Sequence, residues 1–206
     1  MVEENQSKNI ILEQGFEKLA KEGAGNFTVE SLASNLGMSK KTIYKFFPTK
    51  ELLIEKMVTF FTGSILRKFQ AVTESDNKPV EKFEEIMSFL INKVGYLKME
   101  NAMEMKARYP NIWKMVEEFR LDLIHYIAII FREAQSQGYA KSELDMDVVA
   151  IIYMNIINST FQPEFFIKNN LAPSNTISTF VKMVTEGIFL DKEDKTTNHN
   201  KLIWES

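Results

Sequence analysis

Hydrophobic and polar positions along this chain repeat with the period of an α-helix over most of its length. Residues 8 to 22 predict a first helix, which ends in the glycine-rich stretch KEGAGN. The apolar residues that form its single stripe are Ile11, Leu12, Phe16, Leu19 and Ala20. The pattern therefore starts with one amphipathic helix that needs a partner for its apolar face.

Two short helices follow, and each has a hydroxyl residue in the N-cap position. Thr28 precedes a helix that ends at Gly37, and Ser39 precedes a second one that ends at Phe47, before Pro48. Apolar residues stand in hydrophobic-staple positions around both caps: Phe27 with Leu32, and Met38 with Ile43. Val29, Leu32, Ala33 and Leu36 line one face of the first helix.

The rest of the chain predicts one long helix and then a second group of helices. Thr49 can cap a helix that begins at Lys50 and runs to about residue 70, and the polar segment 73–79 separates it from the second group. Further helices are expected at 79–95, 98–107, 110–136, 145–161 and 174–190, with breaks at Tyr109-Pro110, Gly138 and Pro163 to Pro173. Residues 191–206 form a polar tail, in which Leu202, Ile203 and Trp204 could dock.

Composition supports an all-α protein. Sixteen Phe and eleven Met against five Pro and eight Gly are typical of long helices with bulky packing. The absence of cysteine excludes disulfides and thiolate chemistry. The polar, acidic start and the lack of an uncharged apolar run of membrane-spanning length lead us to expect a cytoplasmic protein with no membrane segment.

Positive charge is concentrated on the second short helix, although the whole chain has a net charge of −3. From Ser31 to Lys50 there are four lysines and no acid. Two capped short helices joined at a glycine are the sequence form of a helix-turn-helix, whose second helix enters the DNA major groove. The alternative is an ordinary pair of core helices. The unmixed charge favours DNA contact, because a solvated face usually carries both signs.

The positions on this helix suggest separate roles for its polar residues. Residues at its start, where free amides attract phosphate and side chains reach the bases first, are Ser39, Lys40, Lys41 and Thr42. Tyr44 and Lys45 lie one turn further along and suit phosphate oxygens. Thr49 and Lys50 would hold the DNA backbone at the start of the next helix. Ile43 and Phe46 or Phe47 face inward, and Tyr44 could alternatively be a half-buried core aromatic.

The run from ILEQGFEKLAKEG through TVESLASNLGMSKKTIYKFFPTKELL resembles the DNA-binding region of the tetracycline-repressor (TetR) family of bacterial regulators over about 45 residues. The resemblance implies an all-helical homodimer with an N-terminal three-helix DNA-binding domain and a C-terminal domain for ligand binding and dimerisation. Position by position, the resemblance implies phosphate or base contacts at Thr28, Ser39, Lys41, Thr42, Tyr44, Lys45 and Lys50. Lys41 departs from the glycine or alanine of many members, and Lys45 from their histidine or arginine. We expect domain limits of 1–50 and 51–190.

The charge balance also favours a dimer on double-stranded DNA. Residues 1–50 hold seven lysines and six acids, a net charge of +1, which is weak for a single copy. Two copies would bring eight clustered lysines and a salt slope of roughly −4 to −7. The apolar helices at 147–161 and 176–190 suit the four-helix bundle that the resemblance implies, although the buried core of a monomer would have the same pattern. A dimer predicts a palindromic operator.

A hydrophobic small-molecule effector is expected in the second domain. The candidate ligand-binding residues are Trp113, His125, Tyr126, Tyr153, Asn155 and Asn158. Aromatic and apolar side chains with a few polar groups are typical of a ligand cavity. His125 could equally be a core histidine. Glu104 is the candidate acid if the ligand is cationic.

Little in the sequence indicates an enzyme. Two histidines, no cysteine, no phosphate loop and no nucleophile elbow leave no catalytic or metal-ligating set, so we expect neither a cofactor nor a metal. The chain is interpreted as a ligand-responsive transcriptional repressor. The alternative is a helical ligand-binding or scaffold protein that keeps the helix-turn-helix without specific DNA binding, and loss of DNA binding on changing Lys41 and Lys45 to glutamate would separate the two.

Overall fold

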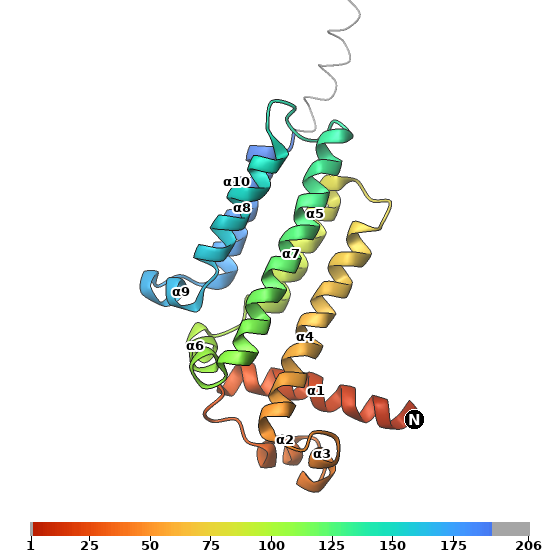
Figure 1. Ribbon diagram of the computed structural model, residues 1–206, viewed down its shortest axis with the longest axis vertical. Helices are drawn as coiled ribbons and strands as arrows, with labels where there is room; N and C mark the ends of the chain where they lie inside the picture. The colour runs from red at the N-terminus through yellow and green to blue at the C-terminus, as the bar shows by residue number, and fades with distance from the viewer. Residues whose placement is uncertain (1, 191–206) are drawn as a thin grey trace, which may run out of the picture.

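The computed structural model describes residues 2–190, which form helices joined by short loops (Figure 1). The helices are α1 (Val2–Glu22), α2 (Val29–Asn35), α3 (Lys40–Phe46), α4 (Lys50–Thr73), α5 (Pro79–Val94), α6 (Met99–Arg108), α7 (Pro110–Ser136), α8 (Met146–Thr160), α9 (Pro163–Asn169) and α10 (Pro173–Ile188). Within these residues the one extended pairing is a single antiparallel bridge between Ala140 and Phe189. The all-α class expected from the sequence is confirmed.

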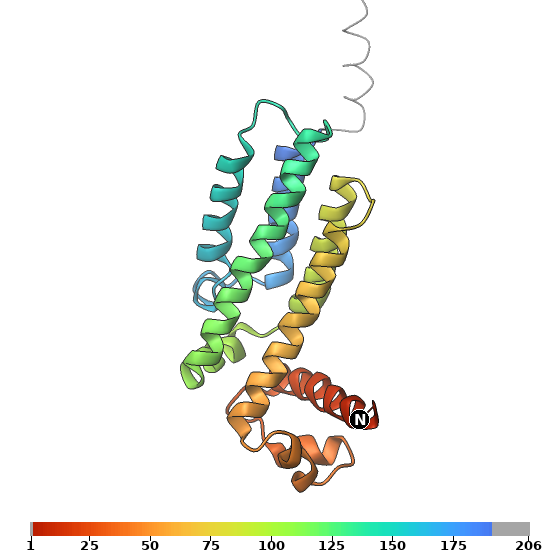
Figure 2. The same cartoon turned by 45° about the vertical axis from the view of Figure 1, so that its right-hand side comes forward.

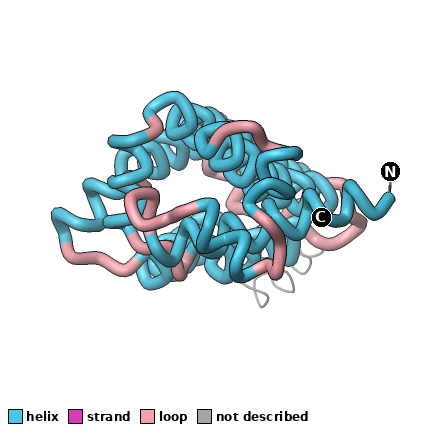
Figure 3. The backbone as a smooth tube through the Cα atoms, turned by 90° about the horizontal axis from the view of Figure 1, so that it is seen from below, coloured by secondary structure: helices cyan, strands magenta, loops and turns pink. Residues whose placement is uncertain are grey.

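The first three helices form a compact head at one end of the molecule, and α4 to α10 form an elongated body. Figures 1 and 2 show α1 lying across the lower end of the body, with α2 and α3 below it and α4 rising from the head into the body. Figure 3 gives the view from below, in which the described residues are drawn as helices joined by loops. The arrangement leaves α3 at the far tip of the molecule.

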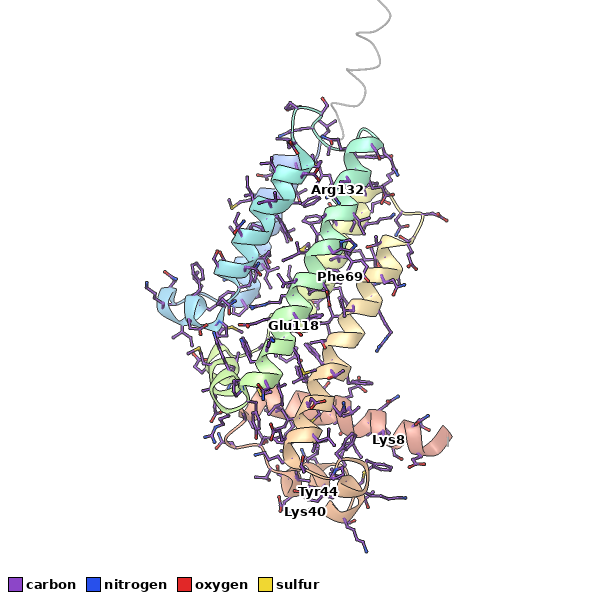
Figure 4. All side chains as sticks on the ribbon, viewed as in Figure 1. Lys8, Lys40, Tyr44, Phe69, Glu118 and Arg132 are labelled. Carbon is purple, nitrogen blue, oxygen red and sulfur yellow. The ribbon has the colours of Figure 1, made fainter. Side chains whose placement is uncertain are left out.

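Two apolar clusters make up the core. The first joins the buried faces of α1 to α3 and the lower part of α4, and it also includes Met105, Ile112 and Trp113 of the body. The second fills the space between α4, α5, α7, α8 and α10, and Phe69, Phe83 and Phe131 are its largest fully buried side chains. Figure 4 shows Phe69 between the helices of the body. The head is therefore packed onto the body rather than attached by a linker.

One buried ion pair joins three elements of the body. Lys82 of α5 is only 3% exposed, and its Nζ lies 3.0 Å from both carboxylate oxygens of Glu133 on α7. The same ammonium donates to the carbonyl of Thr73, the last residue of α4, at 3.0 Å. Removing the carboxylate would leave a buried charge unpaired, so this contact fixes the far end of α4 against α5 and α7.

The predicted helices agree with the structure except at two places. The first helix starts at Val2 rather than at residue 8, because residues 3–7 are polar and lack the stripe that marked its buried part. The segment Pro163 to Pro173, expected to be a break, contains α9. Pro163 occupies its N1 position, and Asn170 ends it with a left-handed conformation (φ 52°). A proline at N1 and a left-handed asparagine after the last helical residue are ordinary signals for the two ends of a helix. The prediction of a break had relied on the two prolines alone. The expected polar tail, 191–206, lies outside the described residues.

Candidate DNA-binding surface and ligand cavity

Three hydroxyl side chains fix the starts of the helices in and after the head. Thr28 Oγ1 accepts from the amide of Ser31 at 3.1 Å, and Thr49 Oγ1 accepts from the amide of Leu52 at 3.1 Å. Ser39 Oγ accepts from the amide of Thr42 at 3.0 Å and lies 2.8 Å from the hydroxyl of Thr42. The three predicted N-caps are confirmed. Each accepts a hydrogen bond from an amide in the first turn of its helix.

The outer face of α3 carries exposed cations on a firmly held helix. Ile43 is fully buried in the head, and Phe47 directly after the helix is also buried, so this side of α3 points inward. Lys41 and Lys45 are exposed on the other side. Figure 4 shows Lys40 and Tyr44 at the tip furthest from the body. Tyr44 is half-buried and packs against the first apolar cluster, which is the alternative that the sequence left open for it.

Lys40 differs from its neighbours because it has an acidic partner. Its ammonium forms an ion pair with Glu30 on α2 and lies 5.5 Å from the centre of the Tyr44 ring. The hydrogen bond from Lys40 holds the pKa of the Glu30 carboxyl below its ordinary value, and Glu30 raises the pKa of Lys40. Glu30 stands one position before the acid-free run, and a helix-to-helix contact brings it back to that run.

Lys50 also has partners within the head. Its Nζ lies 3.4 Å from the carbonyl oxygen of Ala24 and 5.7 Å from the centre of the Phe27 ring. This ammonium is therefore directed toward the α1–α2 loop. In this conformation Lys41 and Lys45 are the exposed cations of α3 that have no ion-pair partner among residues 2–190.

A second basic side chain near α3 comes from α1. Lys8 Nζ lies 5.3 Å from the centre of the Phe46 ring and 4.0 Å from the carboxylate of Glu4. Figure 4 shows Lys8 on the N-terminal part of α1, on the same end of the molecule as Tyr44 and Lys40. Sequence reasoning missed it because only the packing of α1 against the end of α3 brings the two together.

A cavity of about 280 Å³ lies at the junction of the head and the body. Its wall is formed by α1 and by α4 to α10, and it is almost entirely apolar. Residues of α1 that line it, with the loop residue after it, are Phe16, Leu19, Ala20 and Ala24. Aromatic residues of the body that line it are Phe61, Phe69, Trp113, Phe119, Tyr153, Phe161, Phe166 and Phe180. An apolar wall of this kind suits a hydrophobic ligand.

Few polar side chains interrupt this wall. They are Thr62, Lys98, Asn101, Arg120 and Tyr153. Burial raises the pKa of the Tyr153 hydroxyl, so this group stays protonated at neutral pH. Sequence reasoning named Tyr153 but missed Lys98, Asn101 and Arg120. The signal was weak because each lies in a mixed polar stretch whose inward position depends on tertiary packing.

The six predicted ligand residues are not brought together. Trp113 and Tyr153 line the cavity, as expected. His125 and Asn155 are exposed, and the Asn155 amide donates to the carbonyl of Ile151 within its own helix at 2.8 Å. Tyr126 packs in the second apolar cluster, 6.2 Å from the ring of Phe69. Asn158 also lies outside the cavity wall.

The position of His125 follows from the rotation of α7. Ile124 and Ile127 point into the cavity and are buried, whereas Leu121 is 47% exposed on the side that carries His125. Leu121, four positions before His125 on the same side of the helix, therefore does not face the core. Both interpretations from the sequence, a core histidine and a cavity residue, place it on the wrong side of the helix.

Helix α6 connects the cavity to the head through hydrogen bonds. Asn101, whose side chain lines the cavity, donates to the carbonyl oxygens of Ala20 at 2.8 Å and Lys21 at 3.3 Å, near the end of α1. The backbone amide of Gly25 lowers the pKa of Glu104 most, and Arg108 contributes through a hydrogen bond of 3.0 Å. Glu104 is thus used in this contact and is not in the cavity wall, which corrects its interpretation as an acid for a cationic ligand.

Two glycines allow α6 to approach this closely. A Cβ on Gly25 would overlap with Glu104 Oε1, and a Cβ on Gly23 would lie 2.7 Å from Glu104 Oε2 and 2.9 Å from Asn101 Oδ1. Gly23 also has a φ of 82°, which favours glycine. We call the contact of Asn101 and Glu104 with residues 20–25 the α6 latch. The stretch KEGAGN therefore both ends α1 and receives α6.

Residues 2–190 contain no group of three or more acidic or histidine side chains placed to hold a metal ion. None of their helices is long and apolar enough to cross a membrane.

Comparison with known proteins agrees with this geometry. Residues 11–57 match the model of the family "Bacterial regulatory proteins, tetR family". The chain is 24% identical over 188 residues to the uncharacterized HTH-type transcriptional regulator YvaF of Bacillus subtilis (strain 168), a match that covers 91% of this chain and 98% of the relative.

Solved structures with the same fold can be superposed on nearly the whole chain. A putative transcriptional regulator from Saccharomonospora viridis in complex with choline has a TM-score of 0.68 at 18% identity, covering 91% of this chain and all of that one. The transcriptional regulator FadR from Bacillus subtilis in complex with stearoyl-CoA has a TM-score of 0.58 at 16% identity, covering 86% and 97%. At these identities the likeness shows the fold.

Proposed function

Because this chain is a member of the tetR family of bacterial regulatory proteins and a DNA-binding transcriptional regulator, we propose that it is a ligand-responsive repressor that binds a palindromic operator as a homodimer. The observation that carries this proposal is the cavity at the junction of head and body, whose wall includes α1 and whose residue Asn101 is bonded to the end of α1. A molecule in this cavity touches the head and the body at once. The binding free energy of such a molecule can therefore depend on the position of the head relative to the body.

The DNA-binding surface supports the operator part of the proposal. Ser39 caps α3, and its hydroxyl lies 2.8 Å from that of Thr42 at the start of the helix, where Lys41 is exposed. Lys45 lies one turn later for a phosphate contact. In this proposal Thr28, Thr49 and Tyr44 contact the DNA backbone beside α3. Lys40 exchanges its ion pair with Glu30, and Lys50 its hydrogen bond to the Ala24 carbonyl, for contacts with DNA phosphates.

An exposed apolar stripe on α8 supports the homodimer. Its members are Val148, Ile151, Ile152 and Ile156, with exposed fractions of 50%, 58%, 54% and 37%. Met183 on α10 is 66% exposed. The opposite face of α8 packs through Ala150 and Tyr153, which are buried. A second copy of α8 and α10 would cover this stripe and place two α3 helices in successive major grooves.

The proposed response to ligand is a shift between two placements of the head. A ligand that prefers one spacing of the cavity wall would move α1 through the α6 latch, and α4 with it, which changes the distance between the two α3 helices of the dimer. Effector and operator must then change each other's affinity by the same factor. That structures with this fold were solved in complex with choline and with stearoyl-CoA supports a small-molecule effector.

The test is selection of bound duplexes from a random DNA pool by the purified full chain at near-physiological salt. An enriched palindrome is expected, and its loss in the Lys41→Glu/Lys45→Glu variant would assign it to α3. Lys93→Glu/Lys114→Glu is the matched control, because it makes the same charge change on exposed lysines of the body. Failure to enrich any sequence would favour the ligand-binding or scaffold alternative.

The role of the α6 latch is tested by measuring operator affinity with and without ligand, on the operator found by the selection. Gly25→Ala displaces the Glu104 carboxylate and should weaken the effect of ligand on operator affinity while ligand binding persists. Gly63→Ala is the control, because its Cβ would meet only Arg67 at an ordinary 3.4 Å. An unchanged ligand effect in the Gly25→Ala variant would overturn the latch as the route of coupling.

A further inference from the structure

The charges on the cavity wall are all of one sign. Lys98 and Arg120 are its two charged side chains, and within residues 2–190 no carboxylate lines it. Lys98 is exposed and so lies at the edge of the cavity, where solvent screens its charge. Arg120 has only 14% of its side chain exposed. A ligand that fills the cavity therefore meets one desolvated cation among aromatic and aliphatic groups.

The guanidinium of Arg120 is incompletely paired. One terminal nitrogen donates to the carbonyl oxygen of Phe161, at the end of α8, at 2.7 Å. The other lies 3.8 Å from Glu117 Oε1. Its Nε is fully buried and has no hydrogen-bond partner among the described residues. A buried donor without an acceptor is costly, so a ligand oxygen that reached this nitrogen after a small displacement of the side chain would remove that cost.

The nearby carboxylates do not neutralise Arg120 fully. The Glu117 oxygen closest to it also accepts the indole hydrogen bond of Trp113 at 3.0 Å. Glu164 acts on Arg120 only through its field, and its carboxylate is paired with Lys106. Burial lowers the pKa of Arg120, yet a guanidinium remains charged at neutral pH.

We propose that the effector of this protein is an anionic amphipathic molecule, with an apolar chain in the aromatic cavity and a carboxylate or phosphate group bound by Arg120. The open Nε and the adjacent terminal nitrogen of a guanidinium form a planar fork that matches two oxygens of such a group. The inference rests on the proposed function in taking this cavity as the effector site. Arg120 acts as the charge-selecting residue, and Lys98 at the edge attracts the anion more weakly.

A structural role for Arg120 is the competing explanation, since its bond to Phe161 ties α7 to the end of α8. The two explanations differ in their dependence on ligand charge. A purely structural arginine would affect all ligands equally. A charge-selecting arginine affects anions and leaves neutral molecules of the same shape unchanged.

The experiment compares four ligands with one apolar chain by isothermal titration with the full chain, in the absence of DNA. They are decanoate, decyl phosphate, decan-1-ol and decyltrimethylammonium. Wild-type protein is expected to bind one or both anions about 10- to 100-fold tighter than the alcohol, the range of a charge-assisted hydrogen bond. The better anion identifies the head group. Equal binding of alcohol and anions, or tighter binding of the ammonium compound, would overturn the proposal.

Variants then assign the preference to Arg120. Arg120→Met keeps the apolar stem and should reduce the ratio of anion to alcohol affinity to near one, while Arg120→Lys keeps part of it. Gln162→Leu is the matched control, because it removes the other buried unpaired group of this region, Gln162 Oε1, without a change of charge. An anion preference that survives Arg120→Met would overturn the assignment. If Arg120→Met does not fold, Arg120→Lys and the wild-type ligand series decide.

The outcome also separates this inference from the function on which it rests. Anion binding that depends on Arg120 but leaves operator affinity unchanged would overturn ligand-responsive regulation and support the anion site. Release of operator by a neutral or cationic occupant of the same cavity would support the regulator and overturn the anion site.

Discussion

The head and the body differ in the range of the interactions that determine them. At the head, the starts of α2, α3 and α4 are each fixed by a hydroxyl residue three positions away from the amide that it caps, as with Thr28 and Ser31. In the body, the contacts that matter join distant segments, as with Lys82 and Glu133 or Arg120 and Phe161. A DNA-binding surface can therefore be recognised from a short motif, whereas a ligand cavity depends on how eight helices pack.

The largest expected effect is on the body core. Phe131 is fully buried and contacts the rings of Phe83, Tyr153 and Phe189, so Phe131→Ala should lower the free energy of unfolding by about 3–5 kcal/mol. Denaturant unfolding followed by circular dichroism measures this loss. Because Met105, Ile112 and Trp113 of the body pack in the same apolar cluster as the helices of the head, the head is expected to unfold with the body. Separate transitions would show that head and body are independent after all.

The next largest effect concerns the exposed stripe of α8. Ile151→Asp places two carboxylates in the proposed interface, and burying unpaired charge should weaken dimerisation by about a hundredfold or more. Sedimentation at several concentrations measures the dimer. Operator affinity should fall with it, while anion binding in the cavity persists. A stable dimer with Ile151→Asp would place the interface elsewhere. Glu143→Asp, at an exposed acid of the α7–α8 loop, serves as the neutral control.

A smaller effect is expected from single lysines of α3. If only Lys41 and Lys45 contact phosphate, a dimer makes about four contacts and the salt slope is about −4; if DNA also recruits Lys40 and Lys50, as proposed above, the slope approaches about −7. Lys41→Ala should reduce the slope by about 2, one unit for each subunit. Operator binding measured over a salt series tests this. A slope near −7 would mean that DNA recruits Lys40 and Lys50 as well.

The smallest effect is expected from Glu30, which is fully exposed. Glu30→Gln releases Lys40 and should raise operator affinity by about fivefold or less. Because the pKa of Glu30 is lowered in the folded protein, its stabilising contribution is present above the ordinary carboxyl range and is lost as pH falls through the lowered pKa. The raised pKa of Lys40 means that its contribution is lost only as pH rises through that value.

The effect of Glu30→Gln should therefore be constant between about pH 5 and pH 9. Operator binding of the variant and of wild-type protein across this range is the measurement. A ratio that changes inside the range would mean that another titrating group controls Lys40.

The same comparison explains which predictions from the sequence succeeded. The caps at Thr28, Ser39 and Thr49 and the limits of α7 depend on neighbouring residues, and the structure confirms them. The ligand residues depend on the rotation of α7 and α8. Trp113 and Tyr153 proved to line the cavity, but His125 faces outward, and nothing in its own helix could show this. Arg120 was missed because its role is visible only beside Phe161.

The cavity wall has a consequence for building hybrid regulators. Four of its side chains, from Phe16 to Ala24, belong to α1 and the loop after it, and the glycines that receive α6 belong to the same loop. A chimaera that exchanges residues 1–50 for those of a relative would therefore change the cavity wall as well as the DNA-binding helices. Grafting only α2 and α3 would change the DNA-binding specificity and leave the residues that line the cavity unchanged.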